Sequence, residues 1–274
     1  MWTLEQPWIP GRSPLLASTP LTLIATLGVS WLVVAWLAAA GWLTAPVLRV
    51  ASLTAAHGGL LAVALSWGAA DAGVRLPLST VLITFGLIGV GATAAAVDAR
   101  GAVALAATPA WLALLALRGR LVGLALGPEV PVRSLLVGGA LGALMGGHLL
   151  LSASQTLGYP LRGDGWQALL VLWAYDVGAN IVSAECFFRG ALFNRLQRRW
   201  SFGAAAALAT GLSLVRYVAD PLLPRQVEVM AGALFYLTLL GAVNCWLLWW
   251  SGSLVPGLFA AAVFFFAYRA LAIG

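Results

Sequence analysis

The sequence contains no lysine and few charged residues of any kind. Only 9% of its 274 residues are charged, and all fifteen basic residues are arginines. A soluble domain carries about 25% charged residues, so water is not the main solvent of this chain. The arginines are scattered between apolar segments and form no continuous basic patch. We therefore expect no nucleic-acid partner.

Cysteine and histidine are also scarce. The two cysteines, Cys186 and Cys245, both lie inside apolar segments, a placement that does not indicate the disulfide framework of a secreted domain. The two histidines, His57 and His148, each lie in a glycine-rich apolar segment. No group of His, Cys, Asp and Glu residues has the spacing of a metal site. We expect no metal and no cofactor.

Apolar residues make up 62% of the chain. A membrane span needs about 20 mostly apolar residues, and runs of that kind recur from Leu21 to Gly274. Lipid offers the backbone no hydrogen bonds and the alternating pattern of a barrel is absent, so each run must be a helix. The fold class is therefore all-α, a polytopic transmembrane helix bundle of about nine spans, with eight to ten as the range. We place the spans at residues 21–43, 47–70, 77–97, 101–117, 134–155, 166–194, 202–218, 228–250 and 254–272.

The chain divides into three parts. Residues 1–20 contain four prolines together with Trp2 and Trp8, which is typical of an irregular segment at the membrane interface. Residues 21–160 supply the N-terminal transmembrane helices, and residues 161–274 form a C-terminal transmembrane region. The first span is longer than the apolar core of a signal peptide, so we expect it to remain as an anchor.

The distribution of arginines predicts the orientation. Most of those between the spans fall on one side, including Arg12 before the first span and Arg195 after the sixth. The side with more arginines is normally cytoplasmic, which places the N-terminus in the cytoplasm. The lack of lysine is typical of GC-rich coding, and we expect an integral protein of a bacterial inner membrane.

Most polar residues inside the spans lie in the sixth one. An ionisable group at mid-membrane costs roughly 2.5 to 3.5 kcal/mol on insertion scales, so each needs a partner or a purpose. Asp176, Asn180 and Ser183 share one face of a helix. Asp176 and Asn180 are expected either to line a wet cavity or to bond to neighbouring helices, for example at Ser152 or Asn244. We favour the bonds between helices.

Glu185 and Arg189 lie four residues apart on another face of the same helix, where they can pair. Two interpretations are open. The pair is either a self-neutralising structural contact or a part of a catalytic site. The residues alone do not separate the two.

The segment around this pair, Ala-Glu-Cys-Phe-Phe-Arg-Gly-Ala-Leu-Phe at residues 184–193, resembles a known signature. It is similar to the Glu-Glu-x-x-x-Arg motif of the CPBP (or Abi) family, the CAAX-processing and bacteriocin-processing intramembrane endopeptidases. Residues 251–256, Ser-Gly-Ser-Leu-Val-Pro, are similar to the closing hairpin of the same family. The resemblance covers about residues 166–270. The matching positions of the first signature are Glu185, Phe188, Arg189, Gly190 and Leu192.

The resemblance implies intramembrane proteolysis of lipidated or membrane-anchored proteins. In that family the first Glu of the motif and a His on the next helix activate a water molecule. A second His and an Asn on the last helix stabilise the oxyanion. The second Glu and the Arg mainly orient this set, and these two correspond to Glu185 and Arg189.

This sequence departs from the family at every other active-site position. The first Glu falls on Ala184, and the His of the next helix falls on Arg216 or Tyr217. On the last helix, the His falls on Ala261 and the Asn on Phe265. An alanine cannot accept a proton from water, and a tyrosine is a poor base at neutral pH.

We take Glu185 and Arg189 as the candidate catalytic residues, with Tyr217, Cys186 and His148 as weaker candidates. A carboxylate paired with an arginine would be a weak base. Buried apolar cysteines are usually inert, although a thiol is a possible nucleophile. A lone helix histidine such as His148 is more often hydrogen-bonded to a facing helix than catalytic.

Three functions are compatible with this pattern. We favour a weak or inactive protease-like scaffold that lies in the lipid bilayer and binds a lipidated or membrane-anchored protein. The first alternative is an active endopeptidase that uses Glu185 or Cys186. The second is a small transporter with a polar path through Asp176, Asn180 and Glu185, although the broken helices of inverted repeats are missing.

Overall fold

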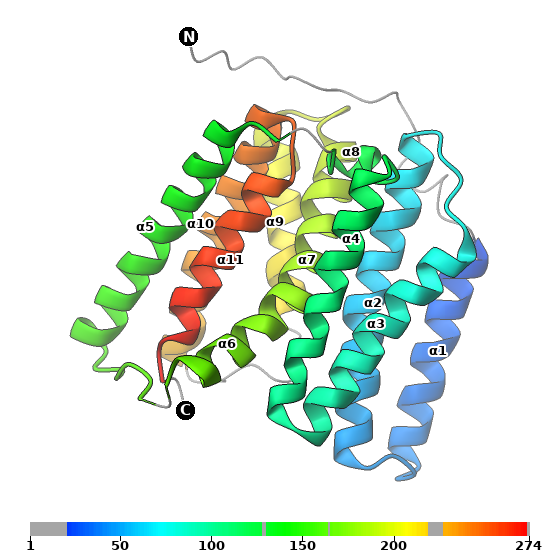
Figure 1. The fold of residues 1–274 in the computed structure, drawn as a ribbon, viewed down its shortest axis with the longest axis horizontal. Coiled ribbons are helices and arrows are strands. Elements are labelled where there is room, and N and C mark those ends of the chain that lie inside the picture. The colour runs from blue at the N-terminus through cyan, green and yellow to red at the C-terminus, as the bar shows by residue number, and fades with distance from the viewer. Residues whose placement is uncertain (1–20, 128–129, 164, 219–226, 273–274) are drawn as a thin grey trace.

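The computed structural model describes residues 21–127, 130–163, 165–218 and 227–272. Within these ranges the chain is a bundle of helices without a strand (Figure 1), apart from one isolated bridge between Leu161 and Leu271. The predicted all-α membrane bundle is therefore confirmed. The expected interfacial segment at residues 1–20 lies outside the described residues.

The N-terminal half contains five α-helices and two short 3-10 segments. Prolines mark several helix starts: Pro46 lies in the first turn of α2, and Pro77 and Pro131 immediately precede α3 and α5. Proline suits these places because a helix start leaves its first N–H groups without partners. The elements are α1 (Leu21–Ala39), α2 (Ala45–Asp71), α3 (Leu78–Val97), η1 (Ala99–Ala106), α4 (Ala107–Leu117), η2 (Val122–Leu124) and α5 (Val132–Thr156).

The C-terminal half begins with one continuous rod, Trp166–Leu196, that changes geometry along its length. Its segments η3 and η4 are π-helical, a rare form that often occurs at functional sites. They begin at Asp176 and Glu185 respectively, the two acidic residues of the rod. The elements are α6 (Trp166–Tyr175), η3 (Asp176–Ile181), α7 (Val182–Ala184), η4 (Glu185–Phe193), α8 (Asn194–Leu196), α9 (Phe202–Val218), α10 (Val227–Ser251) and α11 (Val255–Arg269).

Six of the described helical segments are long and apolar enough to cross a membrane, and three more are shorter apolar helices. Together these nine described segments agree with the predicted number of about nine spans. The chain is therefore an integral membrane protein. The first predicted span was too long at its end, because the chain turns at Gly41 with a positive φ of 71°. In the fourth span, 3-10 geometry changes to α geometry two residues before Pro109, which lacks the N–H of a regular helix.

Helices α5 and α11 approach each other closely along a stripe of glycines. Gly138 and Gly142 lie one turn apart on α5. A Cβ atom at either would overlap the backbone of α11, at Pro256 and Ala260 respectively. Only glycine permits this separation, as is common between membrane helices. The stripe fixes the position of α11, which supplies one wall of the site described below.

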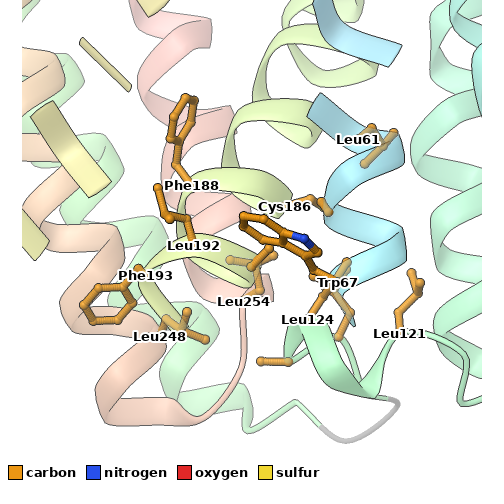
Figure 2. Close-up of a cluster of buried hydrophobic side chains, with 14 of the residues drawn as sticks. Leu61, Trp67, Leu121, Leu124, Cys186, Phe188, Leu192, Phe193, Leu248 and Leu254 are labelled. Atoms are coloured by element: carbon orange, nitrogen blue, oxygen red, sulfur yellow. The ribbon is translucent and has the colours of Figure 1, made fainter. Parts of the chain in front are cut away.

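A buried apolar cluster surrounds the η4 segment (Figure 2). Trp67, Leu124, Cys186, Phe193 and Leu254 all belong to it and are at most 5% exposed. They come from α2, η2, η4 and the turn before α11, so η4 lies in the interior of the bundle. The outer surface is also apolar, which suits contact with lipid.

A buried ionic cluster joins α2 to the end of the rod. Arg195 donates to both carboxylate oxygens of Asp71, at 3.1 and 3.0 Å, and Arg198 donates to the same carboxylate at 2.8 Å. The guanidinium of Arg195 also stacks over the ring of Trp67, 4.5 Å from its centroid. Arg195 had been interpreted only as an orientation signal, and the structure gives it this structural partner as well.

Candidate functional site

Glu185 and Arg189 point from η4 into the bundle and not toward lipid. Their side chains are 5% and 3% exposed, and Arg189 Nη1 lies 3.4 Å from Glu185 Oε1. The same Nη1 donates to Ser213 Oγ on α9 at 3.4 Å. The other carboxylate oxygen of Glu185 has no hydrogen-bond partner among the described residues. The predicted pair therefore exists, and it is weakly hydrogen-bonded for a buried ion pair.

Helix α10 brings further polar and small residues to this pair. Asn244 is fully buried near Glu185, yet neither end of its amide makes a hydrogen bond within the described structure. Gly241 lies against Arg189, and a Cβ atom there would overlap the guanidinium. Thr210 of α9 lies against the same side of Gly241. The ion pair is thus enclosed by polar atoms with unused hydrogen-bonding capacity.

A small cavity, here called the Glu185 cavity, lies beside the pair. Its volume is about 40 Å³, room for a few water molecules at most and too little for a peptide segment. Helices α9, α10 and α11 supply its walls opposite the rod. The residues that line it include Ala184, Glu185, Arg189, Arg216, Tyr217, Gly241, Ala261 and Phe265.

All positions onto which the family's active-site residues map therefore face one space. The position of the first Glu carries the methyl group of Ala184, and the positions on α11 carry Ala261 and Phe265. Arg216 and Tyr217 together supply a guanidinium and a phenol where an imidazole is expected. Among the residues that line this cavity, Glu185 is the single carboxylate and histidine is absent.

A second and larger cavity, here called the arginine cavity, lies next to the first and has a volume of about 350 Å³. Asp176 and Asn180 both line it. Asp176 is fully buried and accepts hydrogen bonds from Arg269, from Nε at 2.6 Å and from Nη2 at 2.9 Å. Neither Ser152 nor Asn244, the partners we had named, makes this contact. A buried carboxylate is better stabilised by a cation than by an amide or hydroxyl, and the end of α11 supplies one.

Arg216 separates the two cavities and is held by residues of two other helices. Its Nη1 donates to Asn180 Oδ1 at 2.7 Å, and its Nη2 lies 3.0 Å from His57 Nδ1. The same Nδ1 is 2.9 Å from Ser183 Oγ, while Nε2 is 3.2 Å from the hydroxyl of Tyr175. A guanidinium only donates, so the imidazole accepts from Arg216 through one of its ring nitrogens, Nδ1 being the nearer and Nε2 lying at 3.4 Å. His57 thus positions Arg216 from α2.

The weaker candidates lie in three different environments. Tyr217 lines both cavities. Cys186 is fully buried in the apolar cluster around η4 and does not line the Glu185 cavity. His148 lies on the exposed face of α5, where its Nδ1 is 2.6 Å from the hydroxyl of Tyr236. Across the described part of the chain, no three His, Cys, Asp or Glu side chains form a group that could hold a metal ion.

Sequence reasoning named His57, Arg216 and Asn244 without finding the contacts they make here, and it did not single out Arg269. A usable signal was present for two of them. Arg216 and Arg269 are charges within apolar helices, and such charges usually pair with one another or line a cavity. Asp176 is an acidic residue within an apolar helix, so a pairing with one of these two arginines could have been predicted. The roles of His57 and Asn244 depend on which helices are neighbours, which the sequence pattern did not give.

Comparison with known proteins gives one family match, in the C-terminal part of the chain. The family described as type II CAAX prenyl endopeptidase, Rce1-like, matches residues 166–267. No curated protein and no solved structure gives a match. The matched segment begins with α6 and ends within α11, so it contains every residue that lines the Glu185 cavity. Arg49, His57 and Arg269, which line or adjoin the arginine cavity, lie outside it.

Proposed function

The chain belongs, through residues 166–267, to the CPBP family of CAAX-protease-like membrane proteins, and we propose from this premise that it is a protease-like scaffold. In this proposal the protein has lost peptide hydrolysis, or retains only a trace of it. It keeps the family's cavity and uses the surrounding surface to bind a lipidated or membrane-anchored protein.

The observation that carries the proposal is the chemistry of the Glu185 cavity. Attack by water needs a base within hydrogen-bond reach of the water molecule. Ala184 supplies no such group where the family has its first Glu. An oxyanion needs donors aimed at it, and Ala261 and Phe265 have none in their side chains. At the positions of the family's first Glu and of its oxyanion donors, this cavity therefore carries apolar side chains.

Glu185 is poorly suited to replace the missing base. One of its carboxylate oxygens faces the guanidinium of Arg189 at 3.4 Å, so part of the carboxylate is already engaged in an ion pair. Arg189 in turn contacts Ser213 on α9. This arrangement supports a role in which the pair joins the rod to α9 and keeps the cavity walls in place.

A groove on the lipid-facing side supports the binding part of the proposal. It has a volume of about 390 Å³ and lies between α1, α2 and η4. Its wall is almost entirely apolar, with Trp31, Ala56, Gly59 and Phe187 among the lining residues. Arg216 lines both this groove and the Glu185 cavity, so the two spaces share a wall. An apolar groove with one guanidinium in its wall suits a lipid chain attached to a polar peptide.

A farnesylated CAAX peptide with a fluorophore tests binding and cleavage together. Anisotropy would measure binding to the full-length protein in detergent, and mass spectrometry would measure cleavage. We expect saturable binding and no cleavage, both for the wild type and for Glu185→Ala. Ala56→Trp should fill the groove and weaken binding. Leu151→Trp, at a position 61% exposed on α5, is the matched control and should bind normally.

Other outcomes would favour the alternatives. Cleavage that disappears in Glu185→Ala would mean an active endopeptidase of unusual chemistry, and cleavage lost only in Cys186→Ala would assign it to the thiol. Solute flux in proteoliposomes that is sensitive to Asp176→Asn would support a transporter. A peptide that fails to bind the wild type would contradict the scaffold proposal.

The arginine distribution also supports a location, which we propose with the function. The N-terminus would lie in the cytoplasm of a bacterial cell, with the protein in the inner membrane. Reporter fusions at the two ends of the chain test this orientation.

A further inference from the structure

The arginine cavity collects guanidinium groups from three helices that are distant in the sequence. Arg49 comes from α2, Arg216 from α9 and Arg269 from α11, and Asp176 is the acidic residue among those that line the cavity. We propose that this cavity binds a phosphate group, carried either by a lipid headgroup or by a free phosphate ion.

The ion pair between Asp176 and Arg269 prepares the cavity for such a ligand. Both carboxylate oxygens of Asp176 accept hydrogen bonds from Arg269, and Asn180 Nδ2 lies 3.4 Å from one of them. These bonds use Nε and Nη2 of Arg269 and leave Nη1 outside the pair. Arg269 is therefore fixed in orientation, and its side chain is 25% exposed. A donor that is already ordered loses less entropy when it binds a ligand.

Arg216 forms the inner wall of the cavity and is equally fixed. Asn180 accepts from its Nη1 at 2.7 Å, and His57 lies 3.0 Å from its Nη2. His57 is itself held by Ser183 and Tyr175. The guanidinium is thus held in position by α2 and the rod before any ligand enters.

Arg49 differs from the other two because it is exposed and makes no ion pair or hydrogen bond within the described residues. It lies in the second turn of α2, and Arg269 is the last residue of α11. These two helix ends lie at the same end of the bundle (Figure 1). A helix end is where a membrane helix meets the headgroup layer, so the phosphates of lipids lie at the depth of this cavity.

The rest of the wall suits a ligand with an apolar part. Val50, Leu53, Ala92 and Leu172 also line the cavity, and Tyr268 adds a phenol. Arginine matches the geometry of phosphate because its planar N–H groups can bind two oxygens at once. The combination of fixed guanidinium groups and an apolar wall therefore fits a phosphate on a lipid better than a fully hydrated ion.

Binding of short-chain lipids to the full-length protein in neutral detergent tests the proposal. The probes are dihexanoyl phosphatidic acid, dihexanoylglycerol, which lacks the phosphate, and inorganic phosphate. Arg49→Gln removes a cavity guanidinium that has no structural partner in the described chain. Arg100→Gln is the matched control, because Arg100 is exposed at the neighbouring η1 segment and does not line the cavity. Thermal unfolding of both variants checks that they are folded.

We expect saturable binding of phosphatidic acid that Arg49→Gln weakens by about tenfold or more, the effect of losing a charge-assisted hydrogen bond. Arg100→Gln should leave the affinity unchanged, and dihexanoylglycerol should not bind. Inorganic phosphate that binds with the same dependence on Arg49 would assign the site to the free ion. Equal weakening by the two variants, equal affinity for dihexanoylglycerol, or no saturable binding of either phosphate compound would overturn the proposal.

Discussion

Arg269 at the end of α11 donates two hydrogen bonds to Asp176 at the start of η3, at 2.6 and 2.9 Å. Asp176 is fully buried. The pair links the last helix of the bundle to the π-helical part of the rod, where regular α-helical hydrogen bonding is interrupted. It joins two segments that are distant in the sequence and stabilises one wall of the arginine cavity.

Removing only the cation of this pair should destabilise the protein. Arg269→Met leaves a buried carboxylate without its partner, a change that costs about 3–5 kcal/mol in comparable sites. Unfolding by a denaturing detergent measures the loss. The double variant Asp176→Leu/Arg269→Met removes both charges and should be more stable than Arg269→Met alone. Additive effects of the two substitutions would show that the pair is not coupled.

Asp71 should be equally sensitive. Arg195 and Arg198 both donate to its carboxylate, and the side chains of all three residues are at most 3% exposed. Asp71→Asn would remove the negative charge to which both guanidinium groups donate and lower the free energy of unfolding by about 3 kcal/mol or more. Asp98→Asn, at an exposed cap of η1, is the control and should cost less than about 1 kcal/mol. A similar loss in both variants would contradict a special role for the cluster.

Gly241 should be required for the position of Arg189. A Cβ atom at Gly241 would overlap the Arg189 guanidinium and lie 2.7 Å from Thr210 Cγ2. Gly241→Ala should therefore displace Arg189 from Glu185 and destabilise the fold by about 1–3 kcal/mol, as overpacking does. Gly232→Ala on the same helix meets no atom within 4 Å and should be neutral or slightly stabilising. The unfolding curves of the two variants measure this difference. If Gly241→Ala is as stable as the wild type, Arg189 and Thr210 can move to make room for the added methyl group, and the prediction is wrong.

The glycine stripe of α5 makes a parallel prediction. Gly142→Ala would place a Cβ atom against the backbone of α11 at Ala260. This backbone can move away only if the whole of α11 shifts. We expect a loss of about 1–3 kcal/mol. Gly147→Ala, with no atom within 4 Å, is the control on the same helix. If the two variants unfold alike, α5 and α11 do not depend on this close contact.

The architecture was predictable because the membrane requires each span to be long, apolar and helical. The predicted span 202–218 coincides with α9, which is bounded by polar residues at its start. The errors occurred where geometry departs from a regular α-helix. The 3-10 start before Pro109 and the turn at Gly41 shifted helix ends, and nothing in an apolar pattern distinguishes the π-helical segments η3 and η4.

The site was only partly predictable. Glu185 and Arg189 were found because their contact is local, one turn apart on the same helix. The contact of Asp176 with Arg269 spans 93 residues, and the contact of His57 with Arg216 spans 159. Such pairs depend on the order in which helices pack, and sequence periodicity carries no information about that order. The resemblance to the family signature indicated which positions lack the family's catalytic side chains, but it did not indicate which residues of other helices lie next to those positions.

Transfer of oxygen from water into a peptide tests the central claim most directly. The full-length protein would be incubated with a farnesylated CAAX peptide in water enriched in heavy oxygen, and the peptide mass measured over time. Hydrolysis places one water oxygen in the new carboxylate. With Ala184, Ala261 and Phe265 at the positions that the resemblance assigns to catalytic groups, we predict no labelled product above that of the protein-free control. A labelled product that forms with the wild type and vanishes with Glu185→Gln would show that the site still activates water.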